Sequence, residues 1–373
     1  MIKENLMKES VNRRSFFNAA AVGTLAAATS PVASAVSTNA APVKVAQIGT
    51  KHAHARSKMT TMRKYPELFD IVGVAESDSR RRREMQDTPA YRGLRWMTEE
   101  QIHTADDIVA IAVETDIDNL LPTAERCVEA GHHIHLDKPA GTSLDHFRRI
   151  CRSADRQGLM IQMGYMYRNN PAFRFTFEAV RRGWLGDIFQ VHCEMSKKVN
   201  RETRIRLAKY AGGSMFELGC HLIDATVTVL GVPQHVSSFL RKTQPEQDQL
   251  MDTCLAVFEY PKATATIRSS LCEVEGNQRR QFVVCGSKGT AVIRPLQPFR
   301  LLLTLEDSVD GFDRGTHEVK LPAPAGPYDG DLKHFAAVIQ GQVPAEYDTA
   351  HDLAVQEMLL QACGMPVNPT GSR

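Results

Sequence analysis

The 373 residues carry a formal charge of +2, with 45 Lys and Arg against 43 Asp and Glu. This near balance argues against a nucleic-acid or membrane-surface partner and favours a small-molecule substrate. Apolar residues at 43% and charged residues at 24% are typical of a globular protein, and the length predicts two domains.

Residues 1–35 are predicted to be a twin-arginine export signal. Arg13 and Arg14 precede a mildly apolar, alanine-rich stretch that ends in Ala-Ser-Ala. We expect cleavage after about Ala35 and no stable membrane insertion afterwards, which predicts a periplasmic or otherwise exported protein. A disordered cytosolic tail is the alternative. Because this route carries folded proteins, the signal also hints at a cofactor that is loaded before export.

Strand and helix patterns alternate after a predicted linker at residues 36–42. The predicted strands cover residues 43–49, 69–77, 106–114 and 132–139, and the predicted helices cover 54–66, 79–87 and 119–131. Parallel strands need a helical crossover between them, so this alternation predicts a doubly wound parallel sheet. We therefore expect a Rossmann domain over residues 43–164.

The second half has a different rhythm. Two predicted helices, 144–158 and 171–186, lead into strands at 187–196, 235–243, 252–261, 263–271, 279–287, 289–295 and 299–307. Successive strands without crossover helices predict a large, mostly antiparallel open sheet in an α+β domain over residues 165–330. Helical patterns return within residues 331–373, and we expect these helices to pack back between the domains.

A single glycine follows the first predicted strand, in "IGTKHAH" at residues 48–54. This position predicts a nucleotide loop in which Gly49 makes the tight turn. The positive or hydrogen-bonding side chains of Lys51 and His52 then stand near a helix N-terminus, where they can contact phosphate. Thr50 and His54 belong to the same predicted contact set. A metal site that uses His52 and His54 is the alternative.

Three further stretches follow in a recognisable order. Glu76 ends the second strand, "HLDKP" spans residues 135–139, and "GGSMFELGCHLID" spans 212–224. Together with the loop they resemble the Gfo/Idh/MocA family of NAD(P)-dependent sugar oxidoreductases, over nearly all of the chain after the signal. The resemblance implies a Rossmann nucleotide domain and a sugar, polyol or glycoside substrate.

The "HLDKP" stretch matches the Glu-Lys-Pro turn of that family. The resemblance implies that Lys138 polarises or protonates the substrate oxygen, and that Asp137 and Pro139 lie among the cofactor contacts. We expect partial burial to lower the pKa of Lys138. Asp137 is one methylene shorter than the family's glutamate, which predicts an altered orientation of the lysine.

The third stretch matches the family pattern Asp-x-Gly-x-His-x-x-Asp, here with Glu217 at its start. On a helix, His221 and Asp224 share a face, and Glu217 joins them if the helix already begins there. We expect the Asp224 carboxylate to orient the imidazole. The resemblance implies that His221 takes the hydroxyl proton as hydride leaves carbon.

Other features bear on the ligands. Glu76 favours NAD over NADP, because a carboxylate binds ribose hydroxyls and repels a 2′-phosphate. The basic run at residues 80–83 is either a solvated helix face or a phosphate contact. "AVETDID" at 112–118 departs from the family pattern and argues against ordinary nicotinamide binding. Tyr165 and Arg168 either line the substrate cleft or pack at the domain interface.

A second histidine pair, His133 and His135, could be a metal pair, but packing is favoured because a site needs further ligands. No metal is therefore predicted.

The leading hypothesis is an exported NAD-dependent oxidoreductase acting on a carbohydrate, with a glycosidase that oxidises, eliminates and reduces as a variant. We expect a homo-oligomer formed through the C-terminal sheet. The rival hypotheses are a metal-dependent hydrolase or lyase using His52 and His54, and a non-catalytic sugar-binding protein whose nucleotide loop has decayed.

Overall fold

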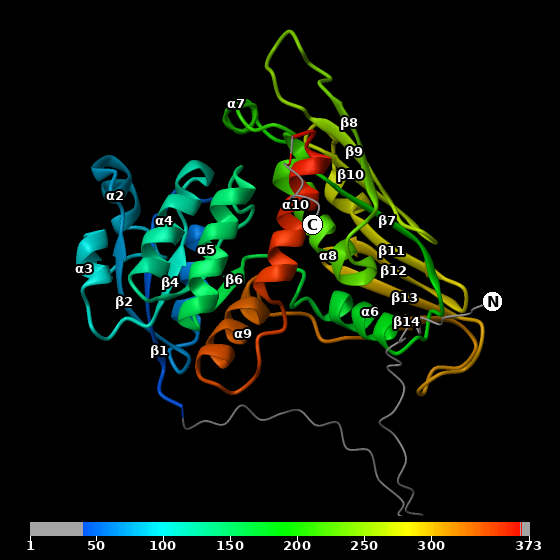
Figure 1. Ribbon diagram of the computed structural model, residues 1–373, viewed down its shortest axis with the longest axis horizontal. Helices are drawn as coiled ribbons and strands as arrows, with labels where there is room; N and C mark the ends of the chain where they lie inside the picture. Colours follow the sequence, from blue (N-terminus) through cyan, green and yellow to red (C-terminus); the bar gives the residue numbers. More distant parts are fainter. Residues whose placement is uncertain (1–39, 366, 368–373) are drawn as a thin grey trace, which may run out of the picture. The chain divides into compact units, whose positions relative to one another are not determined.

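The computed structural model of the protein describes residues 40–365 and 367 (Figure 1). The predicted export signal, residues 1–35, lies outside this range. Within it, none of the helices combines the length and the hydropathy that a bilayer crossing requires.

The N-terminal half contains a six-stranded parallel sheet in the order β3-β2-β1-β4-β5-β6. Its strands are β1 (Val43–Ile48), β2 (Phe69–Ala75), β3 (Trp96–Met97), β4 (Ala110–Val113), β5 (His133–Leu136) and β6 (Ile161–Met163). From β1 to β3 successive strands are added on one side of the sheet, and from β4 to β6 on the other. Doubly wound folds bind ligands at this change of order between β1 and β4. The predicted Rossmann sheet is confirmed.

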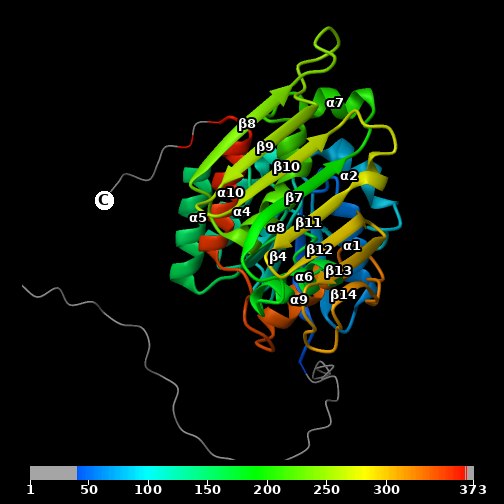
Figure 2. The same cartoon turned by 90° about the vertical axis from the view of Figure 1, so that its right-hand side faces the viewer.

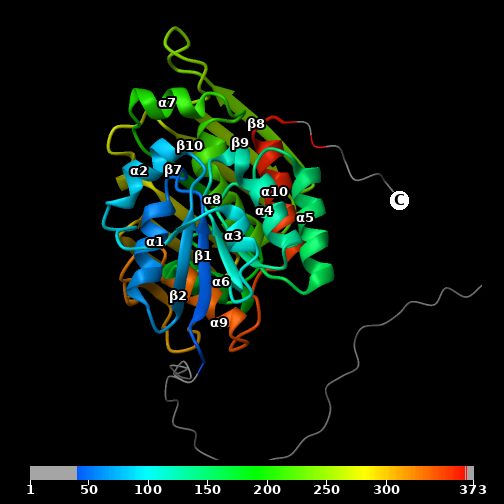
Figure 3. The same ribbon diagram turned by 90° about the vertical axis from the view of Figure 1, so that its left-hand side faces the viewer.

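Helices cover both faces of this sheet (Figure 3). They are α1 (Ala55–Lys64), α2 (Ser79–Gln86), α3 (Glu99–His103), α4 (Ile117–Glu129), α5 (Leu144–Gln157) and, from the end of the chain, α9 (Asp329–Ile339). Side chains alternate along β4, so Ile111 and Val113 pack with α4 and α5, whereas Ala110 and Ala112 pack with α1 and α9. Strand β4, near the middle of the sheet, is therefore buried on both sides.

Local sequence explains where these helices begin and end. In α5 the buried residues Phe147, Ile150 and Ala154 repeat at helical spacing. The Ser143 side chain caps the first turn by accepting a hydrogen bond from the backbone of His146, and Gly158 ends the helix in the left-handed conformation.

The second half contains an eight-stranded sheet in the order β14-β13-β12-β11-β7-β10-β9-β8, antiparallel except between β7 and β10 (Figure 2). Its strands are β7 (Ile188–Ser196), β8 (His235–Arg241), β9 (Thr253–Glu259), β10 (Thr264–Ser270), β11 (Gln281–Gly286), β12 (Gly289–Leu296), β13 (Phe299–Leu305) and β14 (Gly315–Val319). This confirms the predicted mostly antiparallel sheet.

The helical segments of this half are α6 (Pro171–Arg181), α7 (Arg201–Leu207), the π-helical turn η1 (Met215–Gly219), α8 (Cys220–Leu230) and the 3-10 turn η2 (Gly276–Arg279). The last helix, α10 (Thr349–Ala362), packs against α5 on one side and against α8 and β8 on the other (Figure 1). Helices α9 and α10 thus contact both halves: α9 packs against α1 in the first half, and α10 packs against α8 in the second.

Candidate functional site

The predicted nucleotide loop joins β1 to α1. Gly49 has a φ of +88°, and a Cβ there would lie 2.6 Å from the backbone nitrogen of Thr115. Both the left-handed backbone and the close approach therefore require glycine. The backbone and hydroxyl of Thr50 donate to Glu76 Oε2, over 3.0 and 2.7 Å, so the loop is tied to the end of β2.

A pocket of about 420 Å³ opens at the carboxyl ends of β1, β2 and β4. The residues that line it include Gly49, Lys51, Glu76, Ser77, Arg82, Thr115, Asp116 and Asn119. This is the position and the size expected of a pocket for the adenosine part of a dinucleotide. The Glu76 carboxylate is half-buried on its wall.

The basic run divides between three roles. Arg82 lines the pocket, Arg81 donates to the carbonyl of Thr50 over 2.8 Å, and Arg80 pairs with Glu84 on the outer face of α2.

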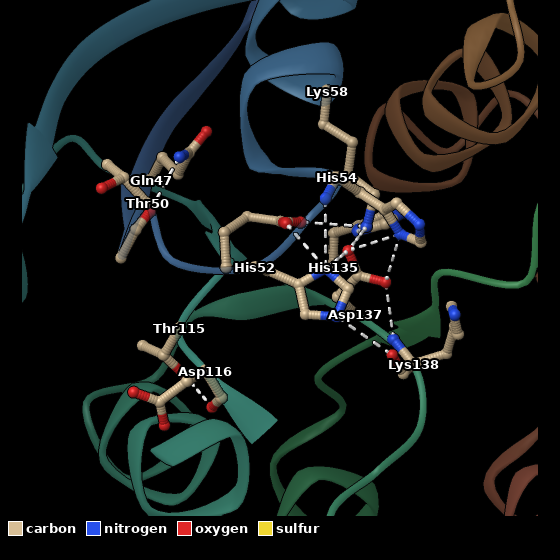
Figure 4. A network of polar contacts seen from close by, with 12 residues as sticks. Gln47, Thr50, His52, His54, Lys58, Thr115, Asp116, His135, Asp137 and Lys138 are labelled. Carbon is tan, nitrogen blue, oxygen red and sulfur yellow. Dashed lines mark hydrogen bonds and ion pairs between the residues drawn. The ribbon is translucent and has the colours of Figure 1, made fainter. Parts of the chain in front are cut away.

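Two loop histidines converge on Asp137 beyond this pocket (Figure 4). His52 Nδ1 lies 2.7 Å from Asp137 Oδ2, and His54 Nδ1 lies 3.2 Å from both oxygens of that carboxylate. Asp137 is fully buried, and its charge faces these side chains. Burial acts to raise the pKa of Asp137, but His52 and Lys58 outweigh it and hold the pKa well below the usual range.

Lys58 lies behind the histidines as a fully buried ammonium group. Its Nζ is 2.8 Å from Asp137 Oδ2 and 2.9 Å from Glu114 Oε1 (Figure 4). It also lies 3.4 Å from His135, whose Nε2 contacts Asp331 Oδ2 over 2.7 Å. Burial would lower the pKa of Lys58, but these carboxylates raise it, so the side chain stays charged.

Glu114 explains the unusual acidic segment after β4. Its side chain is fully buried, and burial together with Asp137 raises its pKa well above the usual value. Asp116, two residues later, has a different task, because its side chain accepts a hydrogen bond from the backbone of Asn119 and caps α4. Neither acid was predicted as part of the site.

Lys138 follows β5 and points towards the second half of the chain. Its Nζ donates to the carbonyl of Glu217 over 3.0 Å. The expected lowering of its pKa is wrong: burial acts in that direction, but the Glu217 charge outweighs it and the pKa is raised. Lys138 is therefore a hydrogen-bond donor or an acid at neutral pH rather than a base.

His221 lies at the start of α8, just after the π-helical turn that contains Glu217. Its ring stands edge-on to Tyr165 and Tyr167, with ring centres 6.0 and 5.6 Å apart. Burial, followed by the Lys138 charge, holds its pKa well below the ordinary value, so the imidazole is neutral. Its Nδ1 is buried and has no hydrogen-bond partner among the described residues.

The predicted pairing of His221 with Asp224 is wrong. Asp224 accepts hydrogen bonds from Arg168, with a shortest distance of 2.6 Å, and it contacts His351 over 3.3 Å. Arg168 also binds Asp352 over 2.6 Å. Helix spacing predicted correctly that His221 and Asp224 are one turn apart, but the carboxylate faces Arg168, between β6 and α6, and His351 on α10.

The two predicted cleft residues, Tyr165 and Arg168, are both enclosed by neighbouring side chains. Arg168 is only 3% exposed and is enclosed by Asp224 and Asp352, so its charge is not free for a ligand. Tyr165 is 1% exposed and packs between the guanidinium of Arg168 and the ring of His221. Both belong to the packing that supports α8.

Two cations complete the surroundings of Lys138. Lys197, directly after β7, lies 3.7 Å from Glu217 Oε1, and Arg280 donates to the carbonyl of Ser196 over 3.1 Å. Burial acts to raise the pKa of Glu217, but Lys138 and Lys197 lower it to about 2. The position of Lys197 at the end of a strand was the one available signal for it in the sequence.

Comparison with known proteins agrees with this architecture. Residues 43–165 match the family described as "Oxidoreductase family, NAD-binding Rossmann fold", and residues 173–292 match "GFO/IDH/MocA C-terminal domain".

Individual relatives are distant. The chain is 25% identical to the uncharacterized oxidoreductase YdgJ of Escherichia coli K12, over 52% of this chain and 55% of that protein. It is also 25% identical to trans-1,2-dihydrobenzene-1,2-diol dehydrogenase of Bos taurus, over 59% of this chain and 65% of that protein. The matches thus span 55% to 65% of the length of these two relatives.

Among solved structures, an Agrobacterium radiobacter oxidoreductase in complex with NAD⁺, L-tartaric acid and magnesium has the same fold. The TM-score is 0.71 at 15% identity, over 86% of this chain and 96% of that one.

Proposed function

This chain belongs to the Gfo/Idh/MocA family of oxidoreductases, and we propose that it transfers hydride between NAD and a carbon of a sugar, polyol or glycoside. The observation that carries the proposal is that Lys138, at the carboxyl edge of the Rossmann sheet, reaches the turn before α8 and lies near enough to His221 for its charge to lower the pKa of that imidazole. The bovine relative is named for a substrate with two neighbouring hydroxyl groups, which supports a polyol-like substrate.

The residues present fit a dinucleotide at its adenosine end. The pocket formed by Gly49, Glu76 and Thr115 would hold that end. Glu76 would accept hydrogen bonds from ribose hydroxyls and repel a 2′-phosphate, which supports NAD over NADP. When bound, the nicotinamide accepts or donates the hydride.

The side chains then handle the substrate oxygen and its proton. Lys138 keeps its proton, so it can donate a hydrogen bond to that oxygen and stabilise negative charge on it. His221 is neutral, and its Nδ1, which has no hydrogen-bond partner within the described residues, can accept the hydroxyl proton when the alcohol is oxidised. In the reverse direction the same nitrogen returns the proton.

We also propose that the protein is exported by the twin-arginine route and forms a homo-oligomer through the C-terminal sheet. The Arg13-Arg14 pair before an alanine-rich stretch supports the export. An oxidation–elimination–reduction glycosidase cycle is a variant of the same hydride chemistry. A cycle that regenerates its own NAD would suit an exported enzyme.

The first test is the content of the protein purified from its own host. We expect denaturation to release about one equivalent of NAD, identified by absorbance and mass, and hydride transfer to appear in a panel of polyols, sugars and glycosides. Protein that neither contains NAD nor binds it when it is added would contradict the proposal and favour the sugar-binding alternative.

The second test concerns the two assigned side chains. Lys138→Met and His221→Gln should each lower kcat by about 10²- to 10⁴-fold, because each removes a group that acts on the proton or the oxygen. Retained NAD binding would show that both variants are folded. The exposed Lys44→Met change is the control, and full turnover of either site variant would remove its assignment.

A further inference from the structure

We propose that His52, His54 and Asp137 form a binding site for a divalent transition-metal ion of the zinc class. Each residue offers one ligand atom, and these atoms all lie within 4.8 Å of one another. Two imidazoles and a carboxylate are a ligand set that zinc and related ions accept, with a remaining position open for water or substrate.

The hydrogen bonds of His52 indicate which nitrogen faces the ion. Its Nε2 lies 3.2 Å from the carbonyl oxygen of Lys138, which can only accept, so Nε2 carries the hydrogen. Its Nδ1 lies 2.7 Å from Asp137 Oδ2. A lone pair and a carboxylate oxygen at this distance need a cation between them, either a second proton or a metal ion. Metal-binding histidines usually donate their other ring N–H in this way, which fixes the orientation of the ring.

His54 favours the metal over the proton. A proton shared by His52 and Asp137 would need no third group, yet His54 Nδ1 also converges on the same carboxylate at 3.2 Å. Ligand atoms about 2.0 Å from a tetrahedral zinc ion lie roughly 3.3 Å apart. The His54–Asp137 spacing of 3.2 Å already matches that value, and the His52–Asp137 spacing of 2.7 Å would have to widen by about 0.6 Å.

Buried carboxylates gather around the cluster. Those of Glu114 and Asp137 lie 2.9 and 2.8 Å from the ammonium group of Lys58, and that of Asp331 lies behind His135 at 2.7 Å from its ring. A cation bound by His52, His54 and Asp137 would therefore lie among acidic groups. Buried carboxylates are retained in proteins when they are paired or bind metal.

Glu114 provides a second observation at the same place. It is fully buried, and Lys58 pairs with its Oε1 over 2.9 Å, whereas its Oε2 accepts no hydrogen bond from the described part of the chain. Its Oε2 lies 3.8 Å from His52 Nδ1. From that position it can bind the ion directly after a small movement, or accept a hydrogen bond from a water molecule on the ion.

The proposed ion has a defined consequence for the chemistry. The side chain of His54 is 20% exposed, and its ring lies beside Tyr328, so the open coordination position is within reach of solvent and ligands. A substrate oxygen bound at that position would be polarised by the ion, which would act as a Lewis acid. The three ligands are separate from the residues that line the nucleotide pocket, so this inference does not depend on NAD.

The test is metal binding by the full chain, stripped with a chelator and titrated with Zn²⁺ and with Co²⁺. We expect one equivalent of tight binding and the visible absorption of low-symmetry, nitrogen-ligated Co²⁺. His54→Gln and Asp137→Asn should each weaken binding by at least about 10-fold, the usual range for loss of a ligand or its support. His235→Gln, an exposed histidine on β8, is the matched control and should bind as the unmodified chain does.

Two further measurements separate the outcomes. Far-UV circular dichroism shows whether each variant is folded, and X-ray absorption of the unmodified Zn²⁺ protein should show imidazole ligands whatever the variants do. Substoichiometric binding, binding equally affected by His235→Gln, or a spectrum without imidazole would each overturn the site. The NAD content of the same sample is measured separately, so a failed metal site and a failed nucleotide assignment give different results.

Discussion

The buried Arg168 cluster gives a prediction that separates structural support from ligand binding. Arg168→Met keeps a long apolar side chain in place but removes the guanidinium that binds Asp224 and Asp352. Two carboxylates would then face each other in a region where Asp224 and Asp352 are almost completely buried.

The expected loss follows from that burial. Removing one member of a buried ion pair costs about 3 to 5 kcal/mol, because the remaining charge stays desolvated. Burial, and then Asp224, already raise the pKa of Asp352, and Arg168 opposes this. Without Arg168 that pKa rises further. A carboxyl group with a raised pKa in the folded state destabilises the fold when it ionises, so the loss should be largest at pH 8 and smaller at pH 5.

Urea unfolding followed by circular dichroism measures this loss at both pH values. The control is Arg174→Met on α6, where an arginine of similar geometry pairs with Glu346 over 2.6 Å at the surface. That change should cost only about 0 to 1 kcal/mol. Adding Asp224→Asn and Asp352→Asn to Arg168→Met should recover part of the stability. Equal losses for Arg168→Met and Arg174→Met, or a changed KM with unchanged stability, would refute the structural role.

Two other predictions concern the nucleotide loop. Gly49→Ala should lower the free energy of unfolding by at least about 2 kcal/mol in urea. A left-handed backbone alone costs roughly 1 to 2 kcal/mol, and the new Cβ meets the backbone of Thr115. Gly158→Ala, where φ is +66° and the space is open, is the control and should lower it less. Glu76→Ala should improve the affinity for NADPH relative to NADH by about 10-fold, or 1.4 kcal/mol, in fluorescence titrations. Glu84→Ala is the control. An unchanged ratio of the two affinities would contradict the role of Glu76.

Much of the fold follows from local sequence patterns. The predicted helix at 144–158 corresponds closely to α5, because its apolar spacing and both of its ends are encoded within the segment. The shortest strands, β3 and β6, were missed, since two or three residues are too few to show a period. The π-helical turn at Met215–Gly219 was also missed, because a helical pattern does not distinguish its extra residue.

The site was less predictable because its partners are distant in the chain. Lys138 and His221 could be selected from motifs, but the partners of Asp224 could not, since helix spacing identifies a face and not its neighbour. Lys58 shows the limit most clearly. In "HARSKMTTMRK" it is one cation among several, and only the tertiary structure surrounds it with carboxylates.

The contact between His135 and Asp331 also has a consequence for biosynthesis. The two residues are 196 positions apart, and Asp331 belongs to the last part of the chain. At 5 to 20 residues per second, roughly 10 to 40 s separate their emergence during translation. Through that interval the nascent Rossmann half lacks the carboxylate that pairs with His135. A ribosome-bound chain that ends before α9 should therefore expose one face of its parallel sheet to chaperones.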